Sequence, residues 1–212
     1  MDNYVFVFGV GNYTEVIIEL IHDVGLGIKG LFHFNNEKTG KRIMGYNVLG
    51  DYSKFLKEYN DENIVVAIGD NNIRVEVFEL LLKNTKNKAI SLIHPKAEIS
   101  KSAKISKKGV YIHSNTFVWT KACVDSYTII SPNAMVSHHA KIKQGCLISA
   151  NAMVGSYVTI NDQVLVGINS GIISKSIQIG KYSIIGGQSF ITKDIPEREV
   201  WAGVPAKKIK NL

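Results

Sequence analysis

His138 and His139 are the adjacent side chains of this sequence best suited to moving a proton. A free imidazole has a pKa near ~6.5, so it can accept a proton close to neutral pH and act as a general base. The pair follows Val136 within a regular repeat, described below, and we expect it near a corner of the fold. The alternative is a solvent-exposed pair without a chemical role.

A glycine loop near the start of the chain has the features of an anion site. Gly9-Val10-Gly11-Asn12 follows a short apolar run and precedes a helical pattern. Free backbone N–H groups at the first turn of a helix favour phosphate. Thr14 replaces the third glycine of the dinucleotide fingerprint, and no acidic residue ends the second predicted strand. These departures disfavour NAD and favour a nucleotide diphosphate, with a ligand-free tight turn as the alternative.

A second polar loop, Gly69-Asp70-Asn71, follows another predicted strand. Ligands of open α/β sheets bind outside the carboxyl ends of parallel strands, so we expect Gly69 and Asn71 beside the glycine loop. Arg74 could reach a phosphate from there. A solvated arginine at the start of a helix fits the sequence equally well.

The first 92 residues alternate predicted strands with predicted helices. Strands are predicted at 4–8, 30–34, 64–68 and 89–93, and helices after Asn12, at 52–59 and at 73–83. Such alternation is typical of a small parallel sheet with right-handed crossovers. We therefore predict a Rossmann-like α/β domain over residues 1–92.

After His94-Pro95 the sequence repeats every six residues. Eleven β-branched aliphatic residues follow one another at this spacing: Ile112, Val118, Val124, Ile130, Val136, Ile142, Ile148, Val154, Ile160, Val166 and Ile172. A small or β-branched residue stands two positions before each of them. The pattern continues upstream to Ala97 and downstream to Ile191, with one extra residue near Gly109 and another near Ser174.

A period of six fits neither a helix nor a flat strand. One repeat is long enough for a short strand and a corner, so three repeats close one turn of a triangular coil. Stacked coils would place each inward aliphatic side chain on its equivalent three repeats away. We therefore predict a parallel β-helix over residues 93–212, in which Cys146 fills an inward position.

Composition narrows the class of protein. The chain has 212 residues, a formal net charge of +7 and two cysteines. It has no apolar run of about 18 residues and no signal-peptide core, so we predict a cytoplasmic protein without membrane insertion. The positive charge suggests anionic ligands. Because the lysines are scattered, nucleic acid is not an expected partner.

The repeat resembles the hexapeptide acyltransferase family, whose members fold as left-handed β-helices and assemble as trimers. Val200-Trp201-Ala202-Gly203-Val204-Pro205-Ala206 is similar to the closing segment of that family, which helps to hold coenzyme A. The glycine loop, the segment 67–74 and Leu92-Ile93-His94-Pro95 are similar to one subfamily. Its members are the N-acetyltransferases of nucleotide-linked 4-amino-4,6-dideoxyhexoses, with sialic acid O-acetyltransferases as relatives.

This resemblance implies an acetyl-CoA-dependent N-acetyltransferase for surface glycan synthesis, in which the N-terminal domain holds the nucleotide sugar. It places the catalytic base on His138. The family commonly has an acid in the next position to orient the ring, where this chain has His139. A second imidazole could orient the first only as a neutral acceptor or through water, and Asp125 or Asp162 could replace the missing acid.

The resemblance also implies a homotrimer with active sites between subunits. Coenzyme A is expected along the groove between C-terminal coils, with acetyl-CoA as the co-substrate. The residues expected to line it are Gly155, Ser156, Gly167, Ile168, Gly186, Gly187 and Lys207. A backbone N–H near Gly155-Ser156 is expected to stabilise the oxyanion of the tetrahedral intermediate.

Three other functions remain open at this point. One is O-acetylation of sialic acid or another glycan sugar, and another is a non-catalytic β-helix that binds a sugar nucleotide. The third is zinc-dependent hydration, since γ-type carbonic anhydrases share the β-helix. They have two histidines five residues apart plus a third upstream, and no such pair occurs here. We therefore expect no metal site.

Overall fold

The computed structural model describes residues 3–212. The chain forms two compact units. One runs to Leu92 and includes Lys107–Gly109, and the other comprises Ile93–Ser106 and Val110–Leu212. Each unit is described below by itself.

The N-terminal unit is a six-stranded sheet with the order β3-β4-β2-β1-β5-β6. All neighbouring strands are parallel except β3 and β4. The strands are β1 (Tyr4–Phe8), β2 (Gly27–His33), β3 (Arg42–Ile43), β4 (Tyr46–Asp51), β5 (Asn63–Val66) and β6 (Lys88–Ala89). The helices are α1 (Asn12–Asp23), α2 (Tyr52–Glu58) and α3 (Asn71–Leu82), with a short 3₁₀ helix η1 (Asn36–Lys38).

The predicted α/β alternation is confirmed, with two differences. The sequence analysis missed the β3–β4 hairpin, which turns through Met44 and Gly45, both with positive φ (45° and 89°). Its strands are short and mix polar with apolar residues, so no periodicity marks them. The predicted strand at 89–93 divides into β6 and β7 (Leu92–Ile93), which lie in different sheets.

An aromatic cluster forms much of the core of this unit. Phe6 and Phe8 of β1, Phe32 of β2 and Phe55 of α2 have neighbouring ring centroids 4.7–5.6 Å apart. Most of these rings meet edge to face, the arrangement that aromatic quadrupoles favour. The cluster therefore holds α2 against the two central strands.

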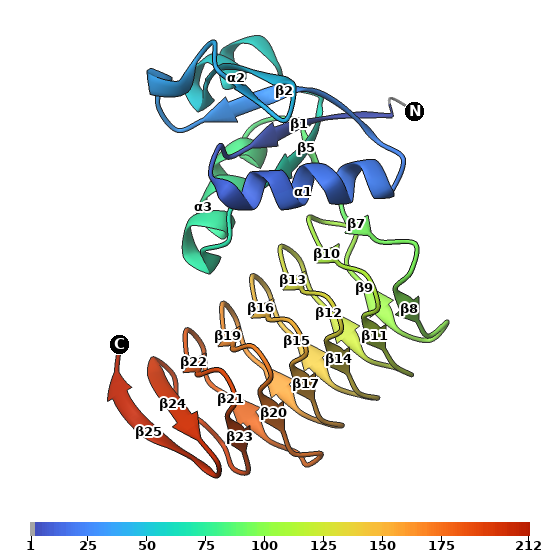
Figure 1. Ribbon diagram of the computed structural model, residues 1–212, viewed down its shortest axis with the longest axis vertical. Helices are drawn as coiled ribbons and strands as arrows, with labels where there is room; N and C mark the ends of the chain where they lie inside the picture. The colour runs from blue at the N-terminus through green and yellow to red at the C-terminus, as the bar shows by residue number, and fades with distance from the viewer. Residues whose placement is uncertain (1–2) are drawn as a thin grey trace. The chain divides into compact units, whose positions relative to one another are not determined.

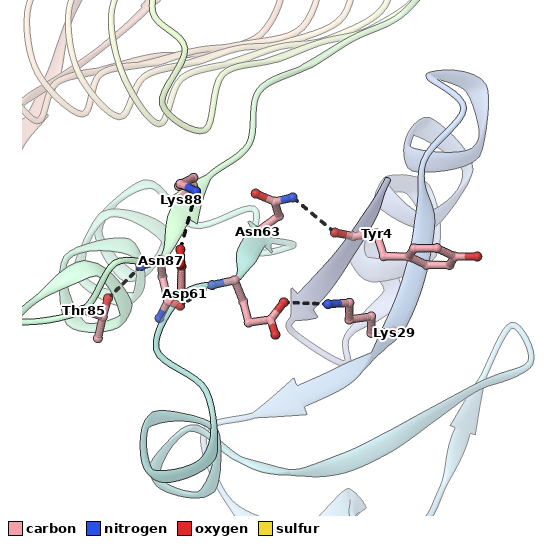
Figure 2. A network of polar contacts seen from close by, with 8 residues as sticks. Tyr4, Lys29, Asp61, Asn63, Thr85, Asn87 and Lys88 are labelled. Atoms are coloured by element: carbon pink, nitrogen blue, oxygen red, sulfur yellow. Dashed lines mark hydrogen bonds and ion pairs between the residues drawn. The ribbon is translucent and has the colours of Figure 1, made fainter. Parts of the chain in front are cut away.

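At the amino-terminal edge of this sheet, charged and polar groups pair with one another (Figure 2). Lys29 Nζ lies 2.8 Å from Glu62 Oε2, and Lys88 Nζ lies 3.5 Å from Asp61 Oδ1. The Asn63 side chain donates to the carbonyl of Tyr4 (3.5 Å). A hollow of about 590 Å³ at this edge is lined by Asp61, Glu62, Asn63 and Lys88 together with Val5, Leu26 and Ile90. Because its charged groups already pair within the protein, we assign it no ligand.

The second unit is a β-helix with three sheets, here called faces I, II and III (Figure 1). Face I has the order β25-β24-β22-β19-β16-β13-β10-β7, face II β23-β20-β17-β14-β11-β8, and face III β21-β18-β15-β12-β9.

The strands of face I are β7, β10 (Tyr111–Ile112), β13 (Ile129–Ile130), β16 (Leu147–Ile148), β19 (Leu165–Val166), β22 (Ile184–Ile185), β24 (Glu199–Gly203) and β25 (Ala206–Asn211). Face II consists of β8 (Glu98–Ile99), β11 (Phe117–Val118), β14 (Met135–Val136), β17 (Met153–Val154), β20 (Gly171–Ile172) and β23 (Phe190–Ile191). Face III consists of β9 (Lys104–Ile105), β12 (Cys123–Val124), β15 (Lys141–Ile142), β18 (Thr159–Ile160) and β21 (Gln178–Ile179).

The six-residue repeat forms the core of this unit, as predicted. The eleven aliphatic residues of the repeat are at most 2% exposed, and the small residues two positions earlier are equally buried. Equivalent strands pair in parallel three repeats apart, such as Ile112 with Ile130. The spacing is one residue longer for Ile99 with Val118 and for Ile160 with Ile179, where the extra residues were predicted.

The corners of the β-helix repeatedly place one residue in the left-handed region. At the corner between faces I and II these residues are Asn115, Asn133, Asn151, Asn169 and Gln188, with φ of 55–60°. Asparagine adopts this conformation at lower cost than most residues. At the corner between faces II and III the same position holds Lys121, His139 and Tyr157, which are less suited to it.

An antiparallel hairpin of β24 and β25 closes the last coil. Trp201 is buried, and its Nε1 donates to Glu199 Oε2 at 2.7 Å. Hydrogen bonds from Lys208 and Trp201 hold the pKa of Glu199 below its ordinary value. The hairpin thereby covers the open end of the aliphatic core.

We predict that Gly155→Ala destabilises the β-helix by about 1–3 kcal/mol, the usual cost of overpacking. A Cβ at Gly155 would lie 2.5 Å from the carbonyl oxygen of Ile172 and 2.6 Å from Ser174 N, so backbone would have to move. Gly171→Ala is the matched control, because its Cβ would meet only the Phe190 side chain, at 3.0 Å. Urea unfolding of both variants checks this, and equal midpoints would contradict it.

Candidate functional site

The two polar loops of the N-terminal unit meet where the strand order reverses. Strand β1 lies between β2 and β5, and the loops after β1 and β5 share one edge. Ala67 N donates to Phe8 O at 2.7 Å. Gly9 has a φ of +131°, and a Cβ there would lie 2.7 Å from Ala67 O, so only glycine fits. Crevices at such reversals are where open α/β sheets bind ligands.

The start of α1 at this edge is open. Gly11 is its N-cap residue and supplies no side-chain hydrogen bond, and both Gly11 and Asn12 are exposed. The first-turn N–H groups of a helix and its dipole favour an anion. The predicted anion site therefore has the local geometry that it requires.

Two hydroxyl groups beneath this loop are buried without a partner. Across residues 3–212, Tyr13 Oη and Thr14 Oγ1 are the buried side-chain oxygen or nitrogen atoms for which no hydrogen bond is formed. Burial raises the pKa of Tyr13 to about 12, against the opposing effect of the Arg74 charge. Because native proteins rarely bury unsatisfied hydroxyls, these two point to a polar group supplied by solvent or a ligand.

Arg74 differs from the expectation of a phosphate contact at the protein surface. Its side chain is fully buried. Its guanidinium donates to the carbonyls of Ile68 (3.1 Å) and Gly69 (3.0 Å) and to Asn71 Oδ1 (2.8 Å). Arg74 therefore fixes the loop after β5, and it reaches this position because α3 begins at Asn71, one turn earlier.

The sequence analysis missed the segment after β2 as part of this edge. Lys38 Nζ donates to the carbonyl of Val10 at 3.1 Å, so η1 is tied to the glycine loop. Asn36 donates to Asp51 Oδ2 at 2.9 Å. Asp51 is the last residue of β4, so this edge does have a carboxylate, but on β4 and not on β2. Asp51 also caps α2, and an aspartate before a helical pattern was the available signal. Burial and the Lys38 charge lower the pKa of His33.

In the β-helix, His138 and His139 lie at the corner between β14 and β15, as predicted, and both are half-buried. Their Nδ1 atoms are 3.1 Å apart. Tyr157, on the next coil, stacks on the His139 ring (centroids 5.1 Å, interplanar angle 20°) and meets His138 edge-on (5.3 Å, 87°).

Neither proposed substitute for the missing acid contacts His138. Asp125 accepts hydrogen bonds from the N–H and hydroxyl of Ser126. Asp162 forms an ion pair with Lys181 at 2.8 Å. Both aspartates lie at the corner between faces III and I, so His139 and Tyr157 are the neighbours of His138 along its own corner.

Gly155 and Ser156 lie one coil after His138, at the same corner. Gly155 N–H donates to Ile172 O (3.0 Å), and Ser156 N–H donates to the Ser174 hydroxyl (3.1 Å). The first bond belongs to the coil-to-coil ladder, so the expectation of Gly155 N–H as an oxyanion donor does not fit. Glycine is needed there for coil packing.

The other residues expected to hold coenzyme A gather at a different corner. Gly167 and Ile168 precede β20, and Gly186 and Gly187 precede β23, both between faces I and II. A Cβ at Gly187 would lie 3.2 Å from Ile168 Cγ2. Lys207 is exposed on β25 and pairs with Ala202, which packs against Gly186. These five residues form one patch, whereas Gly155 and Ser156 lie across face II.

Two further findings concern the described part of the chain. Within residues 3–212, no three His, Cys, Asp or Glu side chains come together as a possible metal site. None of the helices there has the length and apolar character needed to cross a bilayer.

Parts of the chain match known sequences. Residues 4–81 match the family described as the PglD N-terminal domain. An uncharacterised protein of Acanthamoeba polyphaga mimivirus is 30% identical over 127 residues, which are 60% of this chain and 24% of that protein. The chain thus matches about a quarter of the length of this curated relative.

Solved structures resemble the whole chain. A histidine-to-alanine variant of GDP-perosamine N-acetyltransferase from Caulobacter crescentus, in complex with CoA and GDP-perosamine, has a TM-score of 0.89 at 21% identity, covering 98% of this chain and 97% of that one. The acetyltransferase domain of PglB from Neisseria gonorrhoeae, with acetyl coenzyme A, has a TM-score of 0.88 at 24% identity, covering 99% and 100%. WeeI from Acinetobacter baumannii has a TM-score of 0.85 at 20% identity, covering 97% and 99%.

The chain therefore consists of an N-terminal α/β unit, in which residues 4–81 match the PglD N-terminal domain, followed by a left-handed parallel β-helix, and it has the fold of these solved structures throughout.

Proposed function

We propose that the protein is an acetyl-CoA-dependent N-acetyltransferase that acts on a nucleotide-linked 4-amino-4,6-dideoxy sugar for surface glycan synthesis. The observation that carries this proposal is the match of both units, in order and over 98% of the chain, to an N-acetyltransferase with CoA and GDP-perosamine. The two free cysteines fit a reducing compartment, and we propose the cytoplasm.

His138 is the proposed general base of the reaction. The amine of the sugar attacks the thioester carbonyl, a C–N bond forms, and the C–S bond breaks to release coenzyme A. Nε2 of His138 takes the proton that the nitrogen must lose, and the departing thiolate regains a proton to leave as the thiol. His138 suits this role because it is half-buried at a corner, with its Nδ1 already in contact with His139.

The carboxyl edge of the N-terminal sheet is the proposed site of the nucleotide diphosphate. Gly9, Gly11 and Asn12 present the open start of α1, and the loop after β5 lies beside them. Gly69 and Asn71 belong to that loop, and Arg74 holds it from below. The unpartnered Tyr13 and Thr14 hydroxyls support a polar ligand at this edge rather than at the amino edge, where the charges pair with each other.

The proposed acetyl-CoA site uses the patch at the corner between faces I and II. Gly187 and Ile168 are exposed there. Three of the four residues Gly167, Ile168, Gly186 and Gly187 are glycines, so few side chains project from this part of the corner. Lys207 is an exposed cation at the end of this patch, suited to a phosphate. Ser156 is placed beside the base, at the opposite edge of face II.

A homotrimer is the proposed assembly, with active sites between subunits. The outward side chains of face III are Lys104, Cys123, Lys141, Thr159 and Gln178, which are mostly polar. Those of face II include Phe117, Met153 and Phe190, which are 38%, 47% and 39% exposed. Exposed apolar ladders of this kind mark interaction surfaces, and the ladder borders the His138 corner. A second copy packed on face II would enclose that corner.

The function is tested by incubating the protein with acetyl-CoA and nucleotide-linked 4-amino sugars carrying UDP, dTDP or GDP while free thiol is measured. We expect turnover with one of them, and the sugar nucleotide that is used should raise the thermal stability. Turnover on free sialic acid alone would favour O-acetylation. Nucleotide-sugar binding without any turnover would indicate a non-catalytic binding protein.

We predict that His138→Asn lowers kcat by about 10²–10⁴-fold with little change in KM, because only proton removal is lost. Steady-state kinetics against both substrates measure this. His113→Asn is the control among the other histidines of the β-helix, since His113 lies at the corner between faces I and II. Full activity of the His138 variant would remove the proposed base.

We predict that Arg74→Met lowers the free energy of unfolding by about 2–5 kcal/mol, because two carbonyls and Asn71 lose their buried donor. Arg42→Met is the control: its guanidinium also bonds a carbonyl, that of Gly45, but it is exposed and should cost under about 0.5 kcal/mol. Urea unfolding with and without the nucleotide checks this. Lost nucleotide binding at unchanged stability would instead indicate a direct phosphate contact.

We predict that Met153→Asp shifts the assembly from trimer to monomer and lowers activity together with it, since a charge would be buried at the interface. Thr159→Asp is the matched control, because Thr159 occupies the outward position of the same coil on face III. Sedimentation velocity measures both variants. A trimeric Met153→Asp variant would exclude face II as the interface.

A further inference from the structure

The corner that carries His138 has aromatic side chains in its left-handed position on two successive coils. His139 has a φ of 60° and Tyr157 a φ of 64°, whereas the corner between faces I and II uses asparagine on four successive coils. Tyr127 and Tyr182 hold the same backbone position at the corner between faces III and I, so the conformation alone does not distinguish the His138 corner. The contacts between its rings do.

The three rings at this corner contact one another. His139 and Tyr157 occupy equivalent positions on neighbouring coils and stack nearly parallel, at 20° and 5.1 Å. His138 stands perpendicular to both, at 90° to His139 and 87° to Tyr157. The backbone continues the link, because Tyr157 N–H donates to His138 O at 3.3 Å. His138 thus stands edge-on against the stacked pair of His139 and Tyr157.

The contact between the two imidazoles restricts the position of their protons. Two Nδ1 atoms at 3.1 Å can share one hydrogen, so one ring donates and the other accepts. A neutral His138 that donates from Nδ1 has its lone pair on Nε2, the atom that faces away from His139. A neutral His138 that accepts has Nε2 protonated and cannot act as a base.

Carboxylates do not compete for this contact. The corner segments 100–103, 119–122, 137–140, 155–158 and 173–177 contain no aspartate or glutamate. The ionisable side chains on the neighbouring elements are Lys121 and Cys123 on the preceding coil, Tyr157 on the next coil and Lys141 of β15, with Lys101 and Lys175 two coils away on either side. His139 Nδ1 is the hydrogen-bond partner that the structure gives to His138 Nδ1.

We propose that His139, clamped by Tyr157, is a positioning residue that accepts a hydrogen bond from His138 Nδ1–H and so keeps Nε2 unprotonated for catalysis. This inference rests on the proposed acetyl transfer. When His138 Nε2 receives the proton of the amine, the resulting imidazolium donates a charge-assisted hydrogen bond to neutral His139. A neutral imidazole thereby performs the orienting role.

The first test reads the tautomer directly and needs no substrate. The ring ¹⁵N chemical shifts of the histidine-labelled protein at pH 8 should show His138 protonated on Nδ1 and His139 protonated on Nε2. In His139→Asn, which keeps a residue suited to the left-handed position, His138 should become a mixture of tautomers. A His138 that is protonated on Nε2 in the unaltered protein would overturn the proposal.

The second test uses kinetics. We expect His139→Asn to retain its thermal stability but lose about 10–100-fold in kcat, with both KM values within about twofold. His139→Gln, whose longer amide can reach His138 Nδ1, should recover most of the loss. His139→Glu should raise the pH at which kcat/KM reaches half its plateau, because a carboxylate holds the imidazolium of His138 to higher pH.

Tyr157 is tested by a matched pair. Tyr157→Phe keeps the stacking surface and should retain activity, whereas Tyr157→Leu should lose part of the activity lost in His139→Asn. Lys121→Ala is the control, since Lys121 occupies the same corner position one coil earlier. If the unaltered protein transfers acetyl and His138→Asn does not, but His139→Asn has normal kcat and pH dependence, this inference fails alone. An inactive unaltered protein would instead refute the proposed function.

Discussion

The stacking of inward aliphatic side chains along the β-helix is the constraint on which the rest of this structure depends. Each repeat contributes one short strand that is too small to be stable alone, and it is stabilised by its equivalents on the neighbouring coils. Because Val and Ile have stiff rotamers, successive layers repeat almost without variation. The corners are therefore held in register by the core, whatever residues they carry.

That register lets the corners carry chemistry. His138, His139 and Tyr157 need no long-range contacts of their own to be brought together, because they lie at the same corner on two adjacent coils. The N-terminal unit uses the opposite strategy. There, strands of different length bring two loops to one edge, and buried groups such as Arg74 hold those loops in place.

The sequence predicted the fold well wherever periodicity was strong. The repeat identified the coils between Ala97 and Ile191, both inserted residues and the inward set, since a strict period leaves few alternatives. The β3–β4 hairpin was missed because β3 has only two residues and β4 mixes polar with apolar residues, so neither strand shows a period. Among site residues, the corner position of His138 followed from counting, but the burial of Arg74 did not, because sequence does not show what covers a helix start. Gly155 and Gly187 lie at opposite edges of face II. The sequence analysis did not predict this, because it did not assign each repeat to a face.

The stack of coils also fixes distances along the axis of the β-helix. Four strand-to-strand steps along face I separate β13, which opens the coil of His138, from the terminal hairpin at β24. At about 4.8 Å for each step, this fixes an axial length of roughly 19 Å. Side-chain substitution cannot change that length, and evolution can alter it only in whole coils. The axial distance from the C-terminal hairpin to the histidine corner can therefore change only in steps of one coil, and a ligand that extends between them must have a length that fits one of these distances.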